Sequence, residues 1–186
     1  MISLLVIIYI TFISLGLPDS ILGSAWPVMQ TDLHAAFSIA GFVSMTVTAG
    51  TVLSSLLSSR LISKFGTGKV TAVSVFLTAA ALFGYSYTPD VWMLFLFAIP
   101  MGLGAGSIDA ALNNFVALHF KAKHMNWLHC FWGIGATAGP VIMATQIASE
   151  AGWRAGYLII AVIQTVLSAL LFVTLLLWKK TSNGTH

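Results

Sequence analysis

Two acidic residues, Asp19 and Asp109, lie inside long apolar stretches of the chain, and no Lys or Arg lies within these stretches to pair with them. A carboxylate in hydrocarbon is costly unless it faces a polar cavity or a partner. Because burial disfavours its charged form, such a group could bind a proton on one side of a membrane and release it on the other. The two acids therefore predict proton-coupled transport; the alternative is a permanently protonated, hydrogen-bonded carboxyl.

Six further side chains are predicted to line the cavity that the acids face. Asn113 lies four residues after Asp109 and so shares its helix face. Trp26 follows Asp19 at helical spacing. Histidine titrates near neutral pH, and tryptophan offers a flat surface for a sugar ring. The predicted cavity residues are Asn113, Asn114, Trp26, His129, Trp132 and Gln164.

Two of these residues also fit a structural role. His129 lies about one turn from the predicted membrane interface, where a packed or wetted histidine is equally well accommodated. Gln164 is the polar residue nearest the middle of the last apolar stretch. It can line the cavity or form a hydrogen bond with a neighbouring helix.

Small residues recur at every fourth position in two of the apolar stretches. Such a repeat forms a smooth strip on one face of a helix, against which another helix can pack closely. One strip shares its stretch with Asp109 but lies on another helix face. The residues predicted to pack helices together are Gly102, Gly106, Ala110, Gly135 and Gly139.

The composition predicts an integral membrane protein. Of the 186 residues, 58% are hydrophobic and only 7% are charged, against about 25% charged in an average soluble domain. The mean hydropathy is +0.95. We expect no nucleic-acid partner, no enzymatic activity and no cofactor or metal, because the chain has no zinc-type Cys/His spacing, no dinucleotide-binding strand–helix unit and no nucleophile–base pair in a soluble pocket. The lone Cys130 cannot form an intrachain disulfide.

Six stretches have the length that a membrane-spanning helix requires, about 20 residues. We therefore predict an all-α membrane protein with a six-helix bundle over residues 1–180 and a short tail over 181–186. Pro18 and Gly16 should loosen or kink the first helix. The predicted helices cover residues 3–28, 36–59, 70–87, 91–118, 125–148 and 155–178.

The basic residues predict the orientation in the membrane. Seven of them fall on one side of the predicted helices, and only Arg154 falls on the other. By the positive-inside rule that side is cytoplasmic. We expect a multi-pass protein of the cell membrane with both termini in the cytoplasm. The seven are Arg60, Lys64, Lys69, Lys121, Lys123, Lys179 and Lys180.

Several of these segments resemble the N-terminal six-helix half of a major facilitator superfamily transporter, in its fucose-permease-like, sugar-porter-like branch. The similar segments are Gly16-Leu-Pro-Asp19, Gly23-Ser-Ala-Trp26-Pro27, Asp109 to Ala117, and Asn126-Trp-Leu-His129 to Pro140. The resemblance implies half of that fold, built from two inverted three-helix units, and a role for Asp19 and Asp109 in coupling protons to sugar uptake. The 90-residue separation of the two acids fits a three-helix unit used twice.

The chain departs from that family in one loop, in the fifth predicted helix and in length. In that helix Gly135, Gly139 and Pro140 fit the family's antiporter signature, but Met143 and Ala144 stand where paired glycines are expected. The stretch from Ser59 to Lys69 lacks the leading glycine and the aspartate of the family's signature loop. Whole transporters of this type have two such halves, which are parallel repeats. We expect the tail at 181–186 to begin a missing central loop, and a homodimer or a separate C-terminal half to complete the transporter. The alternatives are a truncated, non-transporting fragment, or an antiporter that exports a small lipophilic compound.

Overall fold

The computed structural model describes residues 2–182, which form eight helices. Six spans in this part of the chain are long and apolar enough to cross a membrane, the first being formed by two helices together. The predicted all-helical class is confirmed. The helices are α1 (Ile2–Asp19), α2 (Ile21–Asp32), α3 (Ile39–Phe65), α4 (Thr67–Tyr87), α5 (Val91–His119), α6 (Ala122–Ala148), α7 (Gly152–Val173) and α8 (Leu175–Ser182).

The first span is interrupted between α1 and α2, beside the first of the two acids. Ser20 leaves the helical conformation there, with φ −118° and ψ 0°. Pro18 has no backbone N–H to donate, so the hydrogen-bond ladder is already weakened at this point. The Ser20 hydroxyl instead donates to the carbonyl oxygen of Ala136 on α6, at 2.7 Å. Asp19 therefore lies at a break in its helix, as the proline suggests.

Two other boundaries differ from the sequence-based prediction. Residues 60–69 were expected to connect the second and third predicted helices, but they are almost entirely helical, and only Gly66, whose φ of 80° favours glycine, separates α3 from α4. The last predicted helix is divided at Thr174, whose hydroxyl donates to the carbonyl oxygen of Leu170. Such bonds to the preceding turn commonly bend helices. Of the predicted tail, residues 181 and 182 still belong to α8, and residues 183–186 lie outside the described part.

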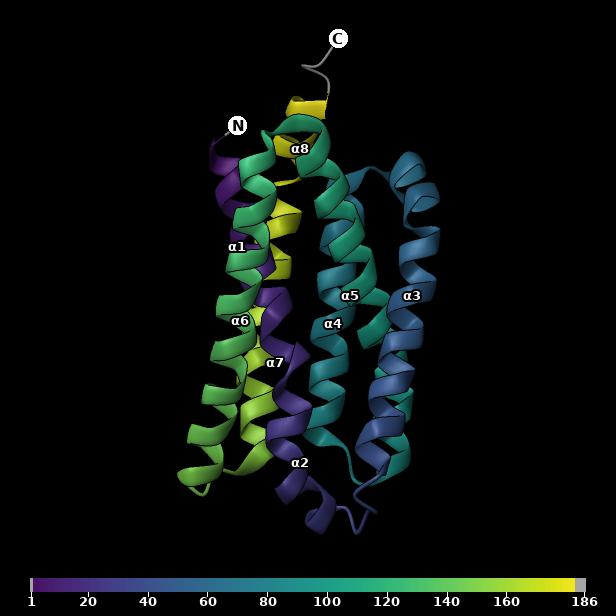
Figure 1. Ribbon diagram of the computed structural model, residues 1–186, viewed down its shortest axis with the longest axis vertical. Coiled ribbons are helices and arrows are strands. Elements are labelled where there is room, and N and C mark those ends of the chain that lie inside the picture. The colour runs from purple at the N-terminus through teal and green to yellow at the C-terminus, as the bar shows by residue number, and fades with distance from the viewer. Residues whose placement is uncertain (1, 183–186) are drawn as a thin grey trace.

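The six spans form two three-helix units: the first contains α1 with α2, α3 and α4, and the second contains α5, α6 and α7. The main helix pairs join one unit to the other. Helix α1 packs on α6, α5 packs on α3, and α4 packs on α7, whereas α3 and α4 have little contact. Thus the first helix of each unit contacts the second helix of the other, and the two third helices contact each other (Figure 1). This exchange is what a pseudo-twofold relation between inverted repeats produces.

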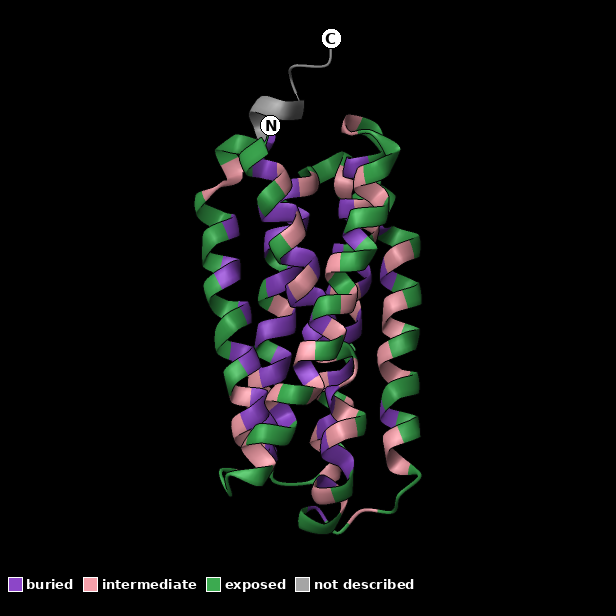
Figure 2. Cartoon of the chain, turned by 60° about the vertical axis from the view of Figure 1, so that its left-hand side comes forward, coloured by how far each residue is buried: buried purple, intermediate pink, exposed green. Residues whose placement is uncertain are grey.

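Two helices, α3 and α6, are far less buried than the rest (Figure 2). In the most apolar window of α3, 11% of residues are buried, and in that of α6, 17%, against 44–61% in the other four spans. Figure 1 shows these two helices at opposite sides of the bundle. Each therefore presents a long uncovered face.

Glycines lie where the paired helices approach most closely. A Cβ at Gly102 or Gly106 of α5 would collide with backbone carbonyl oxygens of α3, and one at Gly135 or Gly139 of α6 with those of α1. Ala110, the third member of the first strip, is half-buried. The neighbouring atoms are backbone and cannot rotate away, so the two helix pairs depend on these glycines.

A pair of substitutions in α6 tests this dependence. We expect Gly135→Ala to destabilise the bundle by about 1–3 kcal/mol, because its Cβ meets the Ile13 carbonyl and overpacking costs that much. Gly133→Ala is the matched control, since nothing lies within 4 Å of a Cβ there. Denaturation in detergent, followed by tryptophan fluorescence, measures both. Equal stability of the two variants would contradict the packing role.

Candidate functional site

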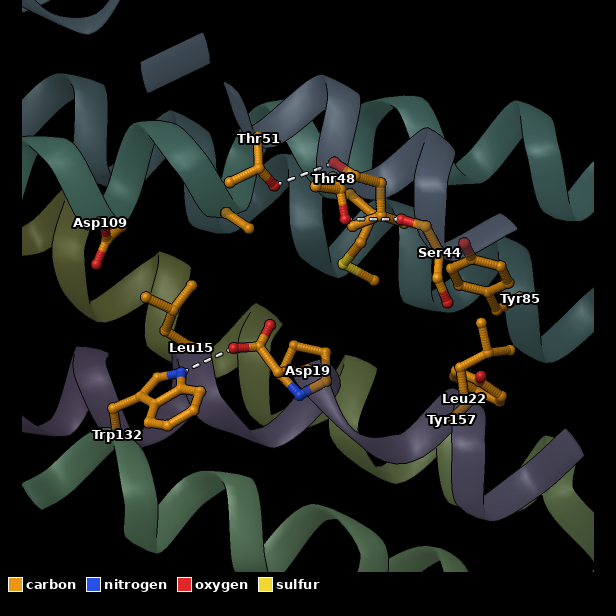
Figure 3. A pocket seen from close by; sticks show the side chains of 14 residues that line it. Leu15, Asp19, Leu22, Ser44, Thr48, Thr51, Tyr85, Asp109, Trp132 and Tyr157 are labelled. Carbon is orange, nitrogen blue, oxygen red and sulfur yellow. Dashed lines mark hydrogen bonds between the residues drawn. The ribbon is translucent and has the colours of Figure 1, made fainter. Parts of the chain in front are cut away.

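A pocket of about 310 Å³ lies between α1 and α6 on one side and α3 and α5 on the other, near the middle of the bundle. Both predicted acids line it (Figure 3). The lining residues are Leu15, Pro18, Asp19, Leu22, Ser44, Val47, Thr48, Thr51, Tyr85, Met101, Ala105, Asp109, Trp132 and Tyr157.

Asp19 reaches the pocket from the break between α1 and α2. Its Oδ2 accepts a hydrogen bond of 2.7 Å from the indole Nε1 of Trp132 on α6 (Figure 3). It is also close enough to Asp109 for the two carboxyls to interact electrostatically. Asp109 lines the same pocket, so two carboxyls from different helices share one site.

Asp109 reaches the same pocket from α5. Its Oδ1 accepts a hydrogen bond of 2.9 Å from the Asn113 side chain, one turn further along the helix. His129 on α6 also interacts electrostatically with this carboxylate. Within residues 2–182 neither acid forms an ion pair with a Lys or Arg. Both side chains are exposed in the isolated chain, so they face open space rather than packed protein.

Hydroxyl groups line the opposite wall and were not predicted from the sequence. Ser44, Thr48 and Thr51 follow one another along α3 (Figure 3). Tyr85 and Tyr157 stack with ring centroids 5.3 Å apart, and neither phenolic hydroxyl has a hydrogen-bond partner among the described residues. The spacing of Ser44, Thr48 and Thr51, four and then three residues, places their side chains on one helix face. This spacing is the sequence signal that could have predicted a polar face on α3.

Two predicted cavity residues lie in the core instead. Trp26 is 2% exposed, and its indole donates to the Phe37 carbonyl oxygen at 3.0 Å. Gln164 is 1% exposed, and its amide donates to the Ser14 carbonyl oxygen at 2.7 Å. Trp26 therefore joins α2 to the connector that precedes α3. Gln164 joins α7 to α1, which is the second of the two roles expected for it.

The remaining predicted residues are divided between several places. Trp132 lines the pocket, and Asn113 bonds to Asp109 from just outside it. His129 lies outside the pocket lining, exposed and edge-on to the Phe12 ring. Asn114 lines a different pocket, at the end of the bundle where α3 meets α4. Across residues 2–182, no group of three His, Cys, Asp or Glu side chains could hold a metal ion.

Six spans that are long and apolar enough to cross a membrane, around a mid-bundle pocket with two carboxyls, are typical of a multi-pass membrane protein. The comparison with known families agrees. The model of the Major Facilitator Superfamily matches residues 8–185, and the chain belongs to that superfamily.

Individual relatives are distant and longer than this chain. The chain is 25% identical over 115 residues to the niacin transporter NiaP of Acinetobacter baylyi, covering 59% of this chain. It is 21% identical over 141 residues to the glucose/mannose transporter GlcP of Bacillus subtilis, covering 75%. It is 23% identical over 155 residues to synaptic vesicle glycoprotein 2B of Rattus norvegicus, covering 81%. The matches span only 26%, 35% and 22% of these relatives' own lengths.

Proposed function

We propose that this chain is one half of a secondary active transporter that couples proton movement to the uptake of a sugar or a similar small polar solute. The observation that carries the proposal is the arrangement of Asp19 and Asp109. They come from different helices, face one pocket, interact with each other, and have no Lys or Arg partner in the described part of the chain. Carboxyls in that setting suit reversible proton binding within the membrane.

The lining of the pocket supports a polyhydroxylated solute. Its polar groups are hydroxyls, two carboxyls and an indole N–H, which together offer both donors and acceptors. The Trp132 ring, 38% exposed, lies beside Asp19 and offers an apolar face to a sugar ring. Among the relatives, the glucose/mannose transporter fits this class better than the niacin transporter does.

The exposure of the site supports a second wall outside this chain. Asp19, Asp109 and Trp132 are all exposed in the isolated chain, and an exposed carboxylate at membrane depth is costly. The uncovered faces of α3 and α6 flank the opening. We propose that a second copy of the chain or a separate C-terminal half covers the site. The excess of basic residues at the end bearing both termini supports a cytoplasmic location for that end in a cell membrane.

Uptake of labelled monosaccharides into proteoliposomes tests the proposed function. We expect at least one monosaccharide to accumulate when the outside is made acidic, and a protonophore to abolish the accumulation. Vesicles without protein provide the baseline. Uptake of the same size with and without the pH gradient would contradict proton coupling. The absence of uptake for every sugar tested would contradict the proposed class of solute.

The hydrogen bond between Trp132 and Asp19 gives a third prediction. Trp132→Phe keeps an aromatic ring but removes the donor, and bonds to charged groups contribute about 1.5–3 kcal/mol. We expect the initial rate of proton-driven uptake to fall about tenfold or more. Trp127→Phe is the matched control, because Trp127 lies on the same helix and packs on Phe131, away from the pocket. Equal losses in the two variants would contradict a specific role for Trp132.

A further inference from the structure

Two pockets other than the acid-lined one meet at the junction of α3 and α4. One has a volume of about 310 Å³, lies beneath the first turn of α4 and is called the polar pocket because Lys69, Asn114 and His119 line it beside apolar side chains. The other is an apolar groove of about 450 Å³ between α3 and α4, with α5 as its floor. Phe65 and Lys69 line both. A polar site and an apolar groove are therefore joined through one basic side chain.

The polar pocket has the features of an anion site. Lys69 and His119 line it, and none of the chain's five acidic residues does. Lys64, on the last turn of α3, lies 5.2 Å from the centre of the Phe65 ring at the pocket wall. The first turn of α4 also contributes: Thr67, Gly68 and Lys69 line the pocket, and no side chain caps this helix start. Free amides at a helix N-terminus favour a phosphate group.

A second observation is independent of the helix end. Trp178 lines the same pocket and is only 4% exposed. Its indole Nε1 is buried and has no hydrogen-bond partner among the described residues. An unpaired buried donor costs free energy, so an acceptor supplied by a ligand would satisfy it. Gly68 makes room for this ring, because a Cβ there would lie 2.6 Å from the Trp178 Cγ.

The groove is apolar and open to the surroundings of the bundle. It exists because α3 and α4 each pack on α5 but scarcely contact each other. Leucines and valines dominate its lining, and Leu57, Leu61 and Val73 are between 37% and 48% exposed. In a bilayer this opening faces lipid chains.

The depth of the junction places the two pockets on either side of the membrane interface. Helix α3 has 27 residues, or about 40 Å at 1.5 Å per residue, whereas the hydrocarbon core is about 30 Å thick. Its last turn, next to Lys69, therefore reaches the headgroup level. The groove runs from there into the hydrocarbon, so that one molecule with a phosphate and an acyl chain can occupy both.

We propose that this junction binds an anionic phospholipid, with its phosphodiester in the polar pocket beside Lys69, His119 and Trp178 and an acyl chain in the groove between α3 and α4. The basic lining without acids selects an anionic headgroup over a zwitterionic one. The proposal is independent of the transported solute, because none of these residues lines the pocket that holds Asp19 and Asp109.

Native mass spectrometry of the purified full chain, with one added probe at a time, tests the site. The probes are phosphatidylglycerol, phosphatidylcholine, a diacylglycerol with the same chains, and inorganic phosphate. We expect phosphatidylglycerol to bind about tenfold more tightly than the other three. Equal binding of phosphatidylcholine would overturn the anionic assignment. Equal binding of inorganic phosphate would make the site one for free anions, and equal binding of the diacylglycerol would overturn the role of the polar pocket.

Three variants locate the binding within the junction. Lys69→Gln removes the charge, Trp178→Phe removes only the indole donor, and Val73→Trp narrows the groove. We expect each to weaken phosphatidylglycerol binding about fivefold to tenfold. Lys123→Gln is the control, an exposed basic residue at the same end that lines neither pocket. Lys69 and Val73 are exposed, so their substitution should leave the fold intact. These two variants therefore test lipid binding even if Trp178→Phe misfolds. Binding unchanged in Lys69→Gln and Val73→Trp would overturn the proposal.

Discussion

Replacing either Asp19 or Asp109 by asparagine is expected to abolish sugar accumulation driven by a proton gradient. A one-proton coupling step can convert each pH unit, 1.36 kcal/mol, into about tenfold accumulation. Without a group that binds the proton, the sugar can only equilibrate, so the accumulation ratio should fall to about one. Asparagine matches the shape of the acid, and its amide oxygen can still accept the Trp132 or Asn113 hydrogen bond. The loss would therefore report on the proton rather than on packing.

Two controls isolate this effect. Sugar exchange between the two sides, at equal pH, should continue in both variants, because exchange needs no net proton movement. Asp90→Asn should leave accumulation unchanged, since Asp90 caps α5 outside the pocket and asparagine caps a helix as well as aspartate does. Wild-type accumulation in both cavity variants would remove the acids from the coupling mechanism.

The second large effect concerns assembly. Suppose that a second copy covers the open side of the acid-lined pocket and is related to the first by a twofold axis along the membrane normal. The uncovered face of α3 in one copy then meets the uncovered face of α6 in the other. Leu56 lies nine residues before the end of α3, and Cys130 lies eight residues after the start of α6. Both ends belong to the same side of the bundle (Figure 1), so the two residues lie at similar depth, about 13 Å from it. Both are also exposed.

Leu56→Cys should therefore form a disulfide with the native Cys130 of a second copy when oxidised in membranes. We expect most of the protein to migrate as a covalent dimer, since a disulfide forms only when the two Cα atoms come within about 7 Å. Phe76→Cys on α4 is the control: this residue is 54% exposed, but its helix packs mainly on α5 and α7. Equal crosslinking of both variants would indicate random collision. No crosslinking of Leu56→Cys would exclude this arrangement of two copies.

The overall architecture could be predicted because it depends on the length and apolar character of continuous stretches, which can be read directly from one sequence. Six apolar stretches of sufficient length specify six spans, and an acid within such a stretch is conspicuous because of its cost. Asp19 and Asp109 were found in this way, and the structure places both in one pocket. The proline before Asp19 likewise indicated the break in the first span.

The orientation of individual side chains could not be predicted in the same way. Trp26 and Gln164 are polar residues within spans, but whether they face a cavity or the core depends on which helices surround them. The hydroxyls of α3 gave a weak signal, because Ser and Thr in any helix can bond to their own backbone, as Thr48 does with the Ser44 carbonyl. The contacts between segments that are distant in the sequence decide which way these side chains face, and no single stretch of sequence encodes those contacts.

The most direct test of the central claim is the movement of protons during solute entry. Sugar is added to proteoliposomes in weakly buffered medium, with no gradient imposed, while an electrode records the external pH. The proposed coupling predicts a rise in external pH that begins with the sugar, scales with the amount taken up, and disappears in Asp19→Asn and Asp109→Asn. Sugar uptake with no change in external pH would contradict it.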